Sequence, residues 1–322
     1  MKRFARRMIF FVLFLYTATT AAMAADYLVP VGKVLGLVLS DNTLTVAAFD
    51  DVLSADTKAA GLKIGDQLVS IDGQAVSTGE DVRRALNRSD GTVDLEILRE
   101  GKTKCLHLQP RITADGPKLG IYLKEGITGI GTVTWYDPQT RKFGALGHGV
   151  SDGNGQLLNL SKGTAHPARI VSIQKGKAGT PGQLRGTLEA DHLLGSIEKN
   201  TDHGVFGSSG SSWASEAIPV AAFNEIRTGS AVIRSCVSEA GPRDYSVEIL
   251  KIYPQNRIDG RNLLLKVTDP ELLNITGGIV QGMSGSPIIQ DGKLVGAVTH
   301  VLVNDPQTGY GIFIENMLEA AG

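Results

Sequence analysis

A short glycine-rich segment near the C-terminus has the composition of a turn that presents a serine nucleophile. Residues 282–287 read Gly-Met-Ser-Gly-Ser-Pro and precede an apolar strand, an Asp291-Gly292 turn and a second strand at 294–301. Glycines on both sides of Ser284 allow a sharp, exposed turn. In such a turn the N–H groups of Gly282 and Ser284 point at one spot, which is the geometry of an oxyanion hole. The whole block, more than Gly-x-Ser-Gly alone, predicts a serine protease nucleophile.

A serine hydroxyl needs a base within hydrogen-bond reach to become a good nucleophile. His148 is the best candidate, because residues 143–149 read as an apolar strand that ends at a glycine-flanked histidine. The alternative is a surface histidine in a turn. His300 lies inside the strand that follows the nucleophile, so we interpret it as part of the cleft wall. The other histidines are interpreted as structural or solvated, namely His107, His166, His192 and His203.

The acid that would orient the base is less well determined. Asp269 precedes Pro270 at the end of an expected strand at 263–267. An aspartate before proline is by default a turn former. Other aspartates also lie between His148 and Ser284, among them Asp152, Asp191 and Asp202, and spacing does not choose among them.

Composition excludes several classes of function. The chain has 322 residues with a net charge of −1 and no long basic block, so nucleic-acid binding has no electrostatic support. Its 39 glycines and few aromatic residues indicate a turn-rich β protein. The two distant cysteines, Cys105 and Cys236, predict free buried thiols more than a disulfide. No Cys/His cluster with metal-ligand spacing is visible, so we predict no metal and no cofactor.

The N-terminus has the pattern of an export signal. Residues 1–25 contain a basic start, an apolar run at 8–16 and small residues that end Ala22-Met23-Ala24. This is the signature of a signal peptide that is cleaved after Ala24, with an uncleaved membrane anchor as the alternative. Either interpretation places the rest of the protein outside the cytoplasm.

Residues 30–110 are expected to form a separate α+β domain. The pattern at 61–73, Gly-Leu-x-x-Gly-Asp-x-Leu-x-x-Ile-x-Gly, resembles the signature of PDZ domains in bacterial exported proteases. Such domains bind an extended peptide as an added strand. The resemblance places the carboxylate-binding loop at Leu35-Gly36-Leu37 and the peptide groove beside a helix at 79–87; the alternative is that these residues are core. The expected strands are 34–39, 44–49, 67–71, 93–99 and 104–108, with a short helix at 55–60.

The remainder of the chain predicts a β domain. Residues 111–117 are rich in proline, glycine and polar residues and are interpreted as a linker. From 118 to 322 short apolar strands alternate with turn residues, which is typical of a barrel or sandwich. The only clear late helix is expected at 315–321.

The site motifs together resemble the stage IV sporulation protein B peptidase family. The resemblance rests on Gly-His-Gly around His148, on Asp269, on residues 277–290 around Ser284, and on Gly-Ala-Val-Thr-His-Val at 296–301. It implies an exported PDZ serine protease with a chymotrypsin-like double β-barrel. It also implies a catalytic triad of His148 as base, Asp269 as orienting acid and Ser284 as nucleophile.

The family further implies a biological role. Its members are secreted into the space between the two membranes around the forespore, where they cleave a membrane-embedded regulator of an intramembrane metalloprotease and so activate a sigma factor. They also cleave themselves near the N-terminus. The expected function is therefore that of a signalling serine endopeptidase. Two alternatives remain, an extracytoplasmic quality-control protease and a non-catalytic PDZ adaptor that binds peptides.

Two positions depart from the trypsin-like pattern. Met283 replaces the aspartate that would pair with a new N-terminus, so that activation switch is not available. Gly278 provides no charge for a specificity pocket, so strict cleavage after Lys or Arg is not expected. By the same analogy, Thr299, His300 and Val301 would pair with the substrate strand; the competing interpretation is a core strand.

Overall fold

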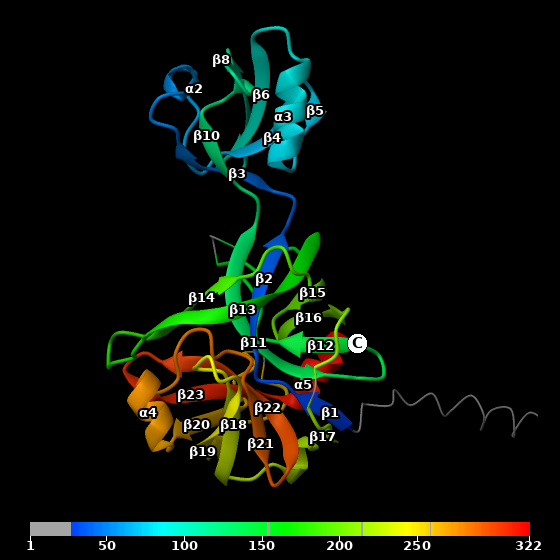
Figure 1. The fold of residues 1–322 in the computed structure, drawn as a ribbon, viewed down its shortest axis with the longest axis vertical. Coiled ribbons are helices and arrows are strands. Elements are labelled where there is room, and N and C mark those ends of the chain that lie inside the picture. Colours follow the sequence, from blue (N-terminus) through cyan, green and yellow to red (C-terminus); the bar gives the residue numbers. More distant parts are fainter. Residues whose placement is uncertain (1–26, 153–154, 214, 258) are drawn as a thin grey trace, which may run out of the picture.

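The computed structural model describes residues 27–152, 155–213, 215–257 and 259–322. The chain folds mainly into strands, arranged as two adjoining β-barrels and a smaller unit beyond them (Figure 1). The expected signal segment at 1–25 lies outside the described residues. Within the described part of the chain, no helix has the length and apolar character needed to span a membrane.

The first barrel is a ring of six antiparallel strands. Its sheet runs in the order β12-β16-β15-β13-β2-β11, and the pairing of β11 with β12 closes the ring. Short strands β1, β14 and β17 extend it. The bounds are β1 Tyr27–Pro30, β2 Val34–Ser40, β11 Ile127–Tyr136, β12 Lys142–Ala145, β13 Lys162–Gln174, β14 Gln183–Leu188, β15 Gly195–Thr201, β16 Gly204–Ser209 and β17 Ile218–Pro219.

The second barrel is also closed and antiparallel, in the order β18-β19-β20-β23-β22-β21. Its strands are β18 Gly229–Ser235, β19 Arg243–Ile252, β20 Leu263–Val267, β21 Pro287–Gln290, β22 Lys293–Leu302 and β23 Asp305–Phe313. Alternating inward residues such as Ile233, Val247 and Leu265 fill its interior. A 3₁₀ turn, Phe223–Glu225, precedes it and helix α5, Ile314–Ala321, follows it. The expected double β-barrel is therefore confirmed.

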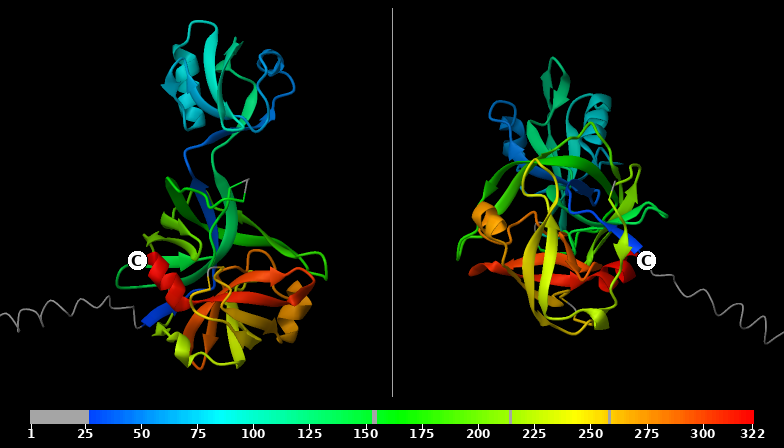
Figure 2. Two further views of the ribbon diagram at one scale, coloured as in Figure 1. Left: turned by 180° about the vertical axis from the view of Figure 1, so that it is seen from behind. Right: turned by 60° about the horizontal axis from the view of Figure 1, so that its bottom comes forward.

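The smaller unit combines helices with a sheet (Figure 2), and it has its own apolar core. Its strand order is β10-β3-β4-β6-β7, with β5 beside β4. Helix α3 forms because Thr78 and Asp81 make a reciprocal capping box and Val82, Ala85 and Leu86 present one apolar face. The bounds are β3 Leu44–Phe49, α2 Ala55–Ala59, β4 Gln67–Ile71, β5 Gln74–Ala75, α3 Gly79–Arg88, β6 Val93–Arg99, β7 Lys102–Leu108 and β10 Ile121–Lys124.

The structure corrects the expected domain boundaries. β2 was expected in the PDZ domain, but it pairs with β11 on one edge and β13 on the other, inside the first barrel. The smaller unit therefore lies between β2 and β11 and precedes most of the peptidase domain in sequence. Leu35, Gly36 and Leu37 lie within β2, and neither edge of that strand is free to accept a peptide.

The expected linker is also structured. Residues 111–117 form most of a hairpin, β8 Arg111–Thr113 with β9 Gly116–Lys118. The chain then pairs β10 with β3 before it returns to the barrel. Residues 118–124, expected at the start of the peptidase domain, thus contribute to β9 and β10 of the smaller unit. One helix was not expected, α4 Pro270–Thr276, and it bears directly on the site.

Candidate active site

Ser284 lies on a tight turn between α4 and β21, at the junction of the two barrels. The Met283 N–H donates to the Val280 carbonyl, and the Ser286 N–H donates to the Met283 carbonyl. Met283 itself is fully buried in the second-barrel core. Among the described residues, no acceptor takes the N–H of Gly282 or Ser284. Two donors therefore remain for a developing oxyanion.

Thr132 of β11 attaches this turn to the first barrel. Its hydroxyl donates to the Gly282 carbonyl at 2.9 Å, and its N–H donates to the Ser284 carbonyl at 3.0 Å. The side chain is fully buried. One residue thus holds the carbonyls of both residues whose N–H groups form the candidate oxyanion hole. This role is not predictable from sequence, because Thr132 lies in an apolar strand far from the serine motif.

Gly285 is required by close packing. Its φ is +94°, and a Cβ there would lie 2.0 Å from the Thr132 carbonyl oxygen. Only glycine tolerates both the left-handed backbone and this approach. Gly282, with φ +97°, takes the same kind of conformation on the other side of the nucleophile. Gly285 thus lets the serine turn pack against β11, and Gly282 lets it pack against Leu184 of β14.

His148 reaches the same place from the first barrel. After β12 the chain turns through Leu146 and Gly147, both with positive φ of about 70°, and this turn projects the histidine toward the second barrel. The His148 Nδ1–H donates to the Gly149 carbonyl at 2.8 Å. That hydrogen bond fixes the tautomer in which Nε2 carries the lone pair. Nε2 is therefore the atom that can accept a proton.

His300 lies beside His148, with ring centroids 5.2 Å apart. Burial lowers the pKa of His148, so its imidazole is neutral at pH 7 and able to act as a base. Burial, with a smaller contribution from the neighbouring His148, lowers the pKa of His300 to about 4. The His300 Nδ1 is buried without a hydrogen-bond partner. The pair thus forms a neutral wall along the cleft.

The Ser284 hydroxyl is held by a backbone carbonyl in this structure. Its Oγ–H donates to the Thr299 carbonyl at 2.8 Å. Proton transfer to His148 therefore requires a change of the serine χ1 rotamer. Such nucleophile–base contacts are often not formed until substrate binds.

A cavity of about 510 Å³ joins these groups, and both barrels line it. Ser284 and His148 are both in its wall, together with Gly282, Thr299, His300 and Val301. Among the described residues that line it, there is no Asp, Glu, Lys or Arg. Apolar side chains dominate the rest of the wall, among them Leu37, Leu39, Ile130, Ile279 and Val280. Leu37, expected in a PDZ loop, thus lines this cavity instead.

The edge of β22 at the cavity is open to a further strand. Residues 299–301 lie in the stretch of β22 that pairs with β23, whereas β21 pairs with β22 only up to Ala297. An extended peptide can therefore add along Thr299, His300 and Val301. This geometry is compatible with the expected pairing of these three residues with substrate.

Within the described part of the chain, Asp269 makes no hydrogen bond to His148. It is the N-cap of α4, where Oδ1 accepts from the Leu272 N–H at 3.0 Å and Oδ2 accepts from the Ser246 N–H at 3.2 Å. Pro270 occupies the first turn of the helix. The carboxylate is thus engaged by two backbone donors, while the Nδ1–H of His148 is satisfied by a carbonyl. The role of Asp269 as the orienting acid therefore stays a prediction, which no hydrogen bond between the described Asp269 and His148 supports.

Two family models match the chain. The model described as SpoIVB peptidase S55 matches residues 116–318, and the model described as PDZ domain matches residues 34–109. The PDZ match begins with β2, although the structure pairs β2 with the barrel.

Curated proteins match over part of the chain. A putative zinc metalloprotease of Rhizobium meliloti (strain 1021) is 34% identical over 101 residues, which are 31% of this chain and 26% of that protein. A putative zinc metalloprotease of Agrobacterium fabrum (strain C58 / ATCC 33970) is 30% identical over 139 residues, 43% of this chain and 34% of that protein. The chain therefore spans about a quarter to a third of these relatives.

Among solved structures, the PDZ domain of an SdrC-like protein from Listeria monocytogenes is 23% identical, with a TM-score of 0.22; the match covers 26% of this chain and 87% of that one. The Rv3671c protease in its inactive form is 14% identical, with a TM-score of 0.35; here 60% of this chain and 84% of that one are covered.

Proposed function

Because the chain belongs to the SpoIVB peptidase S55 family and is a PDZ-containing serine peptidase, we propose that it is an exported signalling endopeptidase with Ser284 as nucleophile and His148 as base. The observation that carries the assignment is the cavity between the barrels. Its wall contains Ser284, the N–H groups of Gly282 and Ser284, and His148, whose Nε2 carries the lone pair.

The reaction follows from these positions. When Ser284 leaves the Thr299 carbonyl, its proton passes to His148 Nε2 as Oγ bonds to the substrate carbonyl carbon. The Gly282 and Ser284 N–H groups bind the oxyanion that forms. His148 then gives the proton to the leaving amine as the C–N bond breaks, and water releases the acyl group by the same steps. The Gly149 carbonyl stabilises the imidazolium through Nδ1–H.

The cavity wall supports a preference for apolar residues at the cut. Its lining is uncharged, so a Lys or Arg side chain of the substrate would be buried there without a counter-charge. Extended peptide would lie along the open edge of β22.

The inserted PDZ unit supports binding of protein or peptide substrates at a second place. β10 is an edge strand of its sheet. The N-terminus of α3 is joined to the residue after β10, because the Gly79 N–H donates to the Glu125 side chain, and α3 also packs on β9. We place the peptide groove between β10 and α3, with residues 118–121 as the loop that precedes it. A charge in this strand, Ile121→Glu, should abolish binding of peptide ligands, whereas the exposed Val69→Glu on β4 should not.

The family supports a more specific role in sporulation. We propose secretion into the space between forespore and mother cell, cleavage there of a membrane-embedded regulator of an intramembrane metalloprotease, and self-cleavage near the N-terminus. The test is mass spectrometry of the purified chain with such a regulator. Few cuts in the regulator and trimming of the N-terminus support the proposal, and broad digestion of denatured casein would favour quality control.

The nucleophile itself is tested by Ser284→Ala and by a fluorophosphonate probe. We expect the wild-type chain to be labelled and the variant to be folded, unlabelled and inactive. Turnover that persists in Ser284→Ala would remove the assignment, and an unlabelled, inactive wild-type chain would favour the peptide-binding adaptor.

A further inference from the structure

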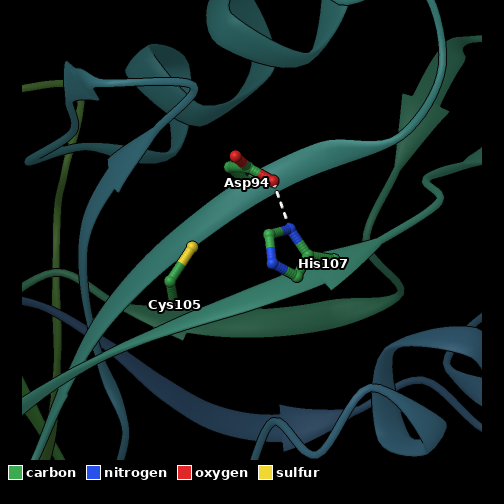
Figure 3. Close-up of side chains that lie close together, drawn as sticks. All are labelled: Asp94, Cys105 and His107. Atoms are coloured by element: carbon green, nitrogen blue, oxygen red, sulfur yellow. Dashed lines mark hydrogen bonds and ion pairs between the residues drawn. The ribbon is translucent and has the colours of Figure 1, made fainter.

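Three metal-binding side chains meet on the PDZ unit, far from the active site in sequence. Asp94 lies on β6, and Cys105 and His107 lie on the adjacent β7, where Asp94 is directly opposite His107. Ligand atoms of the three lie within 4.8 Å of one another, and all three residues are exposed (Figure 3). Cys105, expected as a buried thiol, is therefore accessible to solvent.

The hydrogen bonding within the cluster prepares the histidine for a metal. The Asp94 carboxylate is bonded to His107 Nδ1, which fixes the tautomer with the lone pair on Nε2. Figure 3 shows Nε2 on the side of the ring that faces Cys105. A carboxylate that holds a histidine in this way is the usual outer partner of a zinc ligand. The free ring nitrogen of His107 and the Cys105 thiol thus lie on neighbouring positions of one sheet face.

We infer that Asp94, Cys105 and His107 form a Zn²⁺ site in which Cys105 Sγ and His107 Nε2 bind the ion and Asp94 orients the imidazole. Sulfur and imidazole ligands together favour Zn²⁺ over Mg²⁺ or Ca²⁺, which prefer oxygen. Water completes the tetrahedral shell. On binding, the Cys105 S–H bond is replaced by a Zn–S bond and the proton passes to the buffer.

The position in the fold keeps this site open. All three side chains are exposed, so an ion bound between them would be open to solvent. The site is independent of the catalytic assignment, because none of its residues lines the cavity between the barrels. Its affinity should be that of an open site with two direct protein ligands, below that of a closed four-ligand structural zinc.

The test uses Co²⁺ as a spectroscopic substitute for Zn²⁺ on the purified full chain. We expect one equivalent of Co²⁺ to give the near-ultraviolet absorption of a cobalt–thiolate bond, and Zn²⁺ to displace it. Cys105→Ser and His107→Ala should remove this band. Asp94→Ala should keep it but weaken binding by about 10- to 100-fold, the usual effect of losing an outer partner.

Two matched controls use the other free cysteine and another exposed histidine–carboxylate pair. Cys236→Ser and His192→Ala, the latter beside Glu189, should leave the band unchanged. Circular dichroism of every variant shows that the fold is kept. A wild-type chain without the band, a band that survives Cys105→Ser, or one that is lost in Cys236→Ser would each overturn the inference.

Discussion

The attachment of the serine turn to Thr132 predicts a catalytic defect far from the motif in sequence. Thr132→Val keeps the shape of the side chain and removes only the hydroxyl that donates to the Gly282 carbonyl. Without that bond the residue that supplies one oxyanion N–H loses its side-chain tether to β11. We expect kcat to fall while KM changes little, because the donors act mainly in the transition state.

The size of the effect follows from the bond that is lost. A hydrogen bond whose carbonyl is left unpaired costs about 1–2 kcal/mol. If the lost hydrogen bond destabilises the catalytically active conformation of the turn by this amount, kcat decreases about 5- to 30-fold. The backbone bond from Thr132 N–H to the Ser284 carbonyl remains, so the loss should stay below the roughly 100- to 1,000-fold caused by removing an oxyanion donor.

The chain offers a matched control two residues along the same strand. Thr134 is equally buried, but its hydroxyl has no partner. Thr134→Val therefore removes an unsatisfied polar group and should leave kcat unchanged and stability equal or higher. Steady-state kinetics on one peptide substrate, with urea unfolding of each variant, compares the two. Equal kcat values for Thr132→Val and Thr134→Val would refute the proposed attachment.

Three further predictions follow from the site. Asp269→Asn keeps a good N-cap, so kcat should stay within about twofold of the wild-type value. Asp269→Ala removes the cap and should lower the free energy of unfolding by about 1 kcal/mol. A decrease in kcat of Asp269→Asn near the ~10⁴-fold caused by loss of a triad acid would assign Asp269 to the catalytic triad. Because the folded pKa of His300 is about 4 against a usual 6.5, the unfolded chain binds more protons between these values. Stability should therefore fall as pH decreases from 6.5 toward 4, and His300→Gln should flatten this loss in urea unfolding at pH 7 and 5; an equally steep loss in the variant would exclude His300. A peptide library should show apolar residues before the cut bond, and a preference for Lys or Arg would contradict the uncharged cavity.

Local signals were sufficient for the PDZ elements. The expected strands 44–49, 67–71 and 93–99 coincide with β3, β4 and β6. Their ends are marked by turn residues, and their alternation is set by one buried face. Such patterns report on neighbours in sequence, which is why the bounds were predictable.

The location of β2 was not predictable from the same signals. An apolar strand at 34–40 fits either sheet, and its pairing with β11 and β13 depends on contacts between segments about 90 to 130 residues apart. The Asp94–Cys105–His107 cluster has a different origin, because it depends on the register of the β6–β7 hairpin, which places Asp94 opposite His107.

The cap role of Asp269 has a local signal in the sequence. Asp-Pro-Glu at 269–271 combines an N-cap residue, proline in the first turn and an acidic first turn, which together predict a helix start. The family resemblance assigns this carboxylate a catalytic role, whereas the local pattern predicts that it caps a helix. In the structure both carboxylate oxygens serve the cap and the neighbouring β19.

The insertion gives the PDZ unit a direct physical connection to the active site. Its two connections to the barrels are β2 and β11, and these strands pair with each other from Val34 to Leu39. β2 contributes Leu37 and Leu39 to the cavity wall, and β11 contributes Ile130 to the wall and Thr132 to the serine turn. A force on the PDZ unit therefore acts on strands that already form the cavity, without any intermediate element. Thr132, which holds the Ser284 turn, pairs with Val34 of β2, so a shift in the pairing of β2 and β11 would move this attachment.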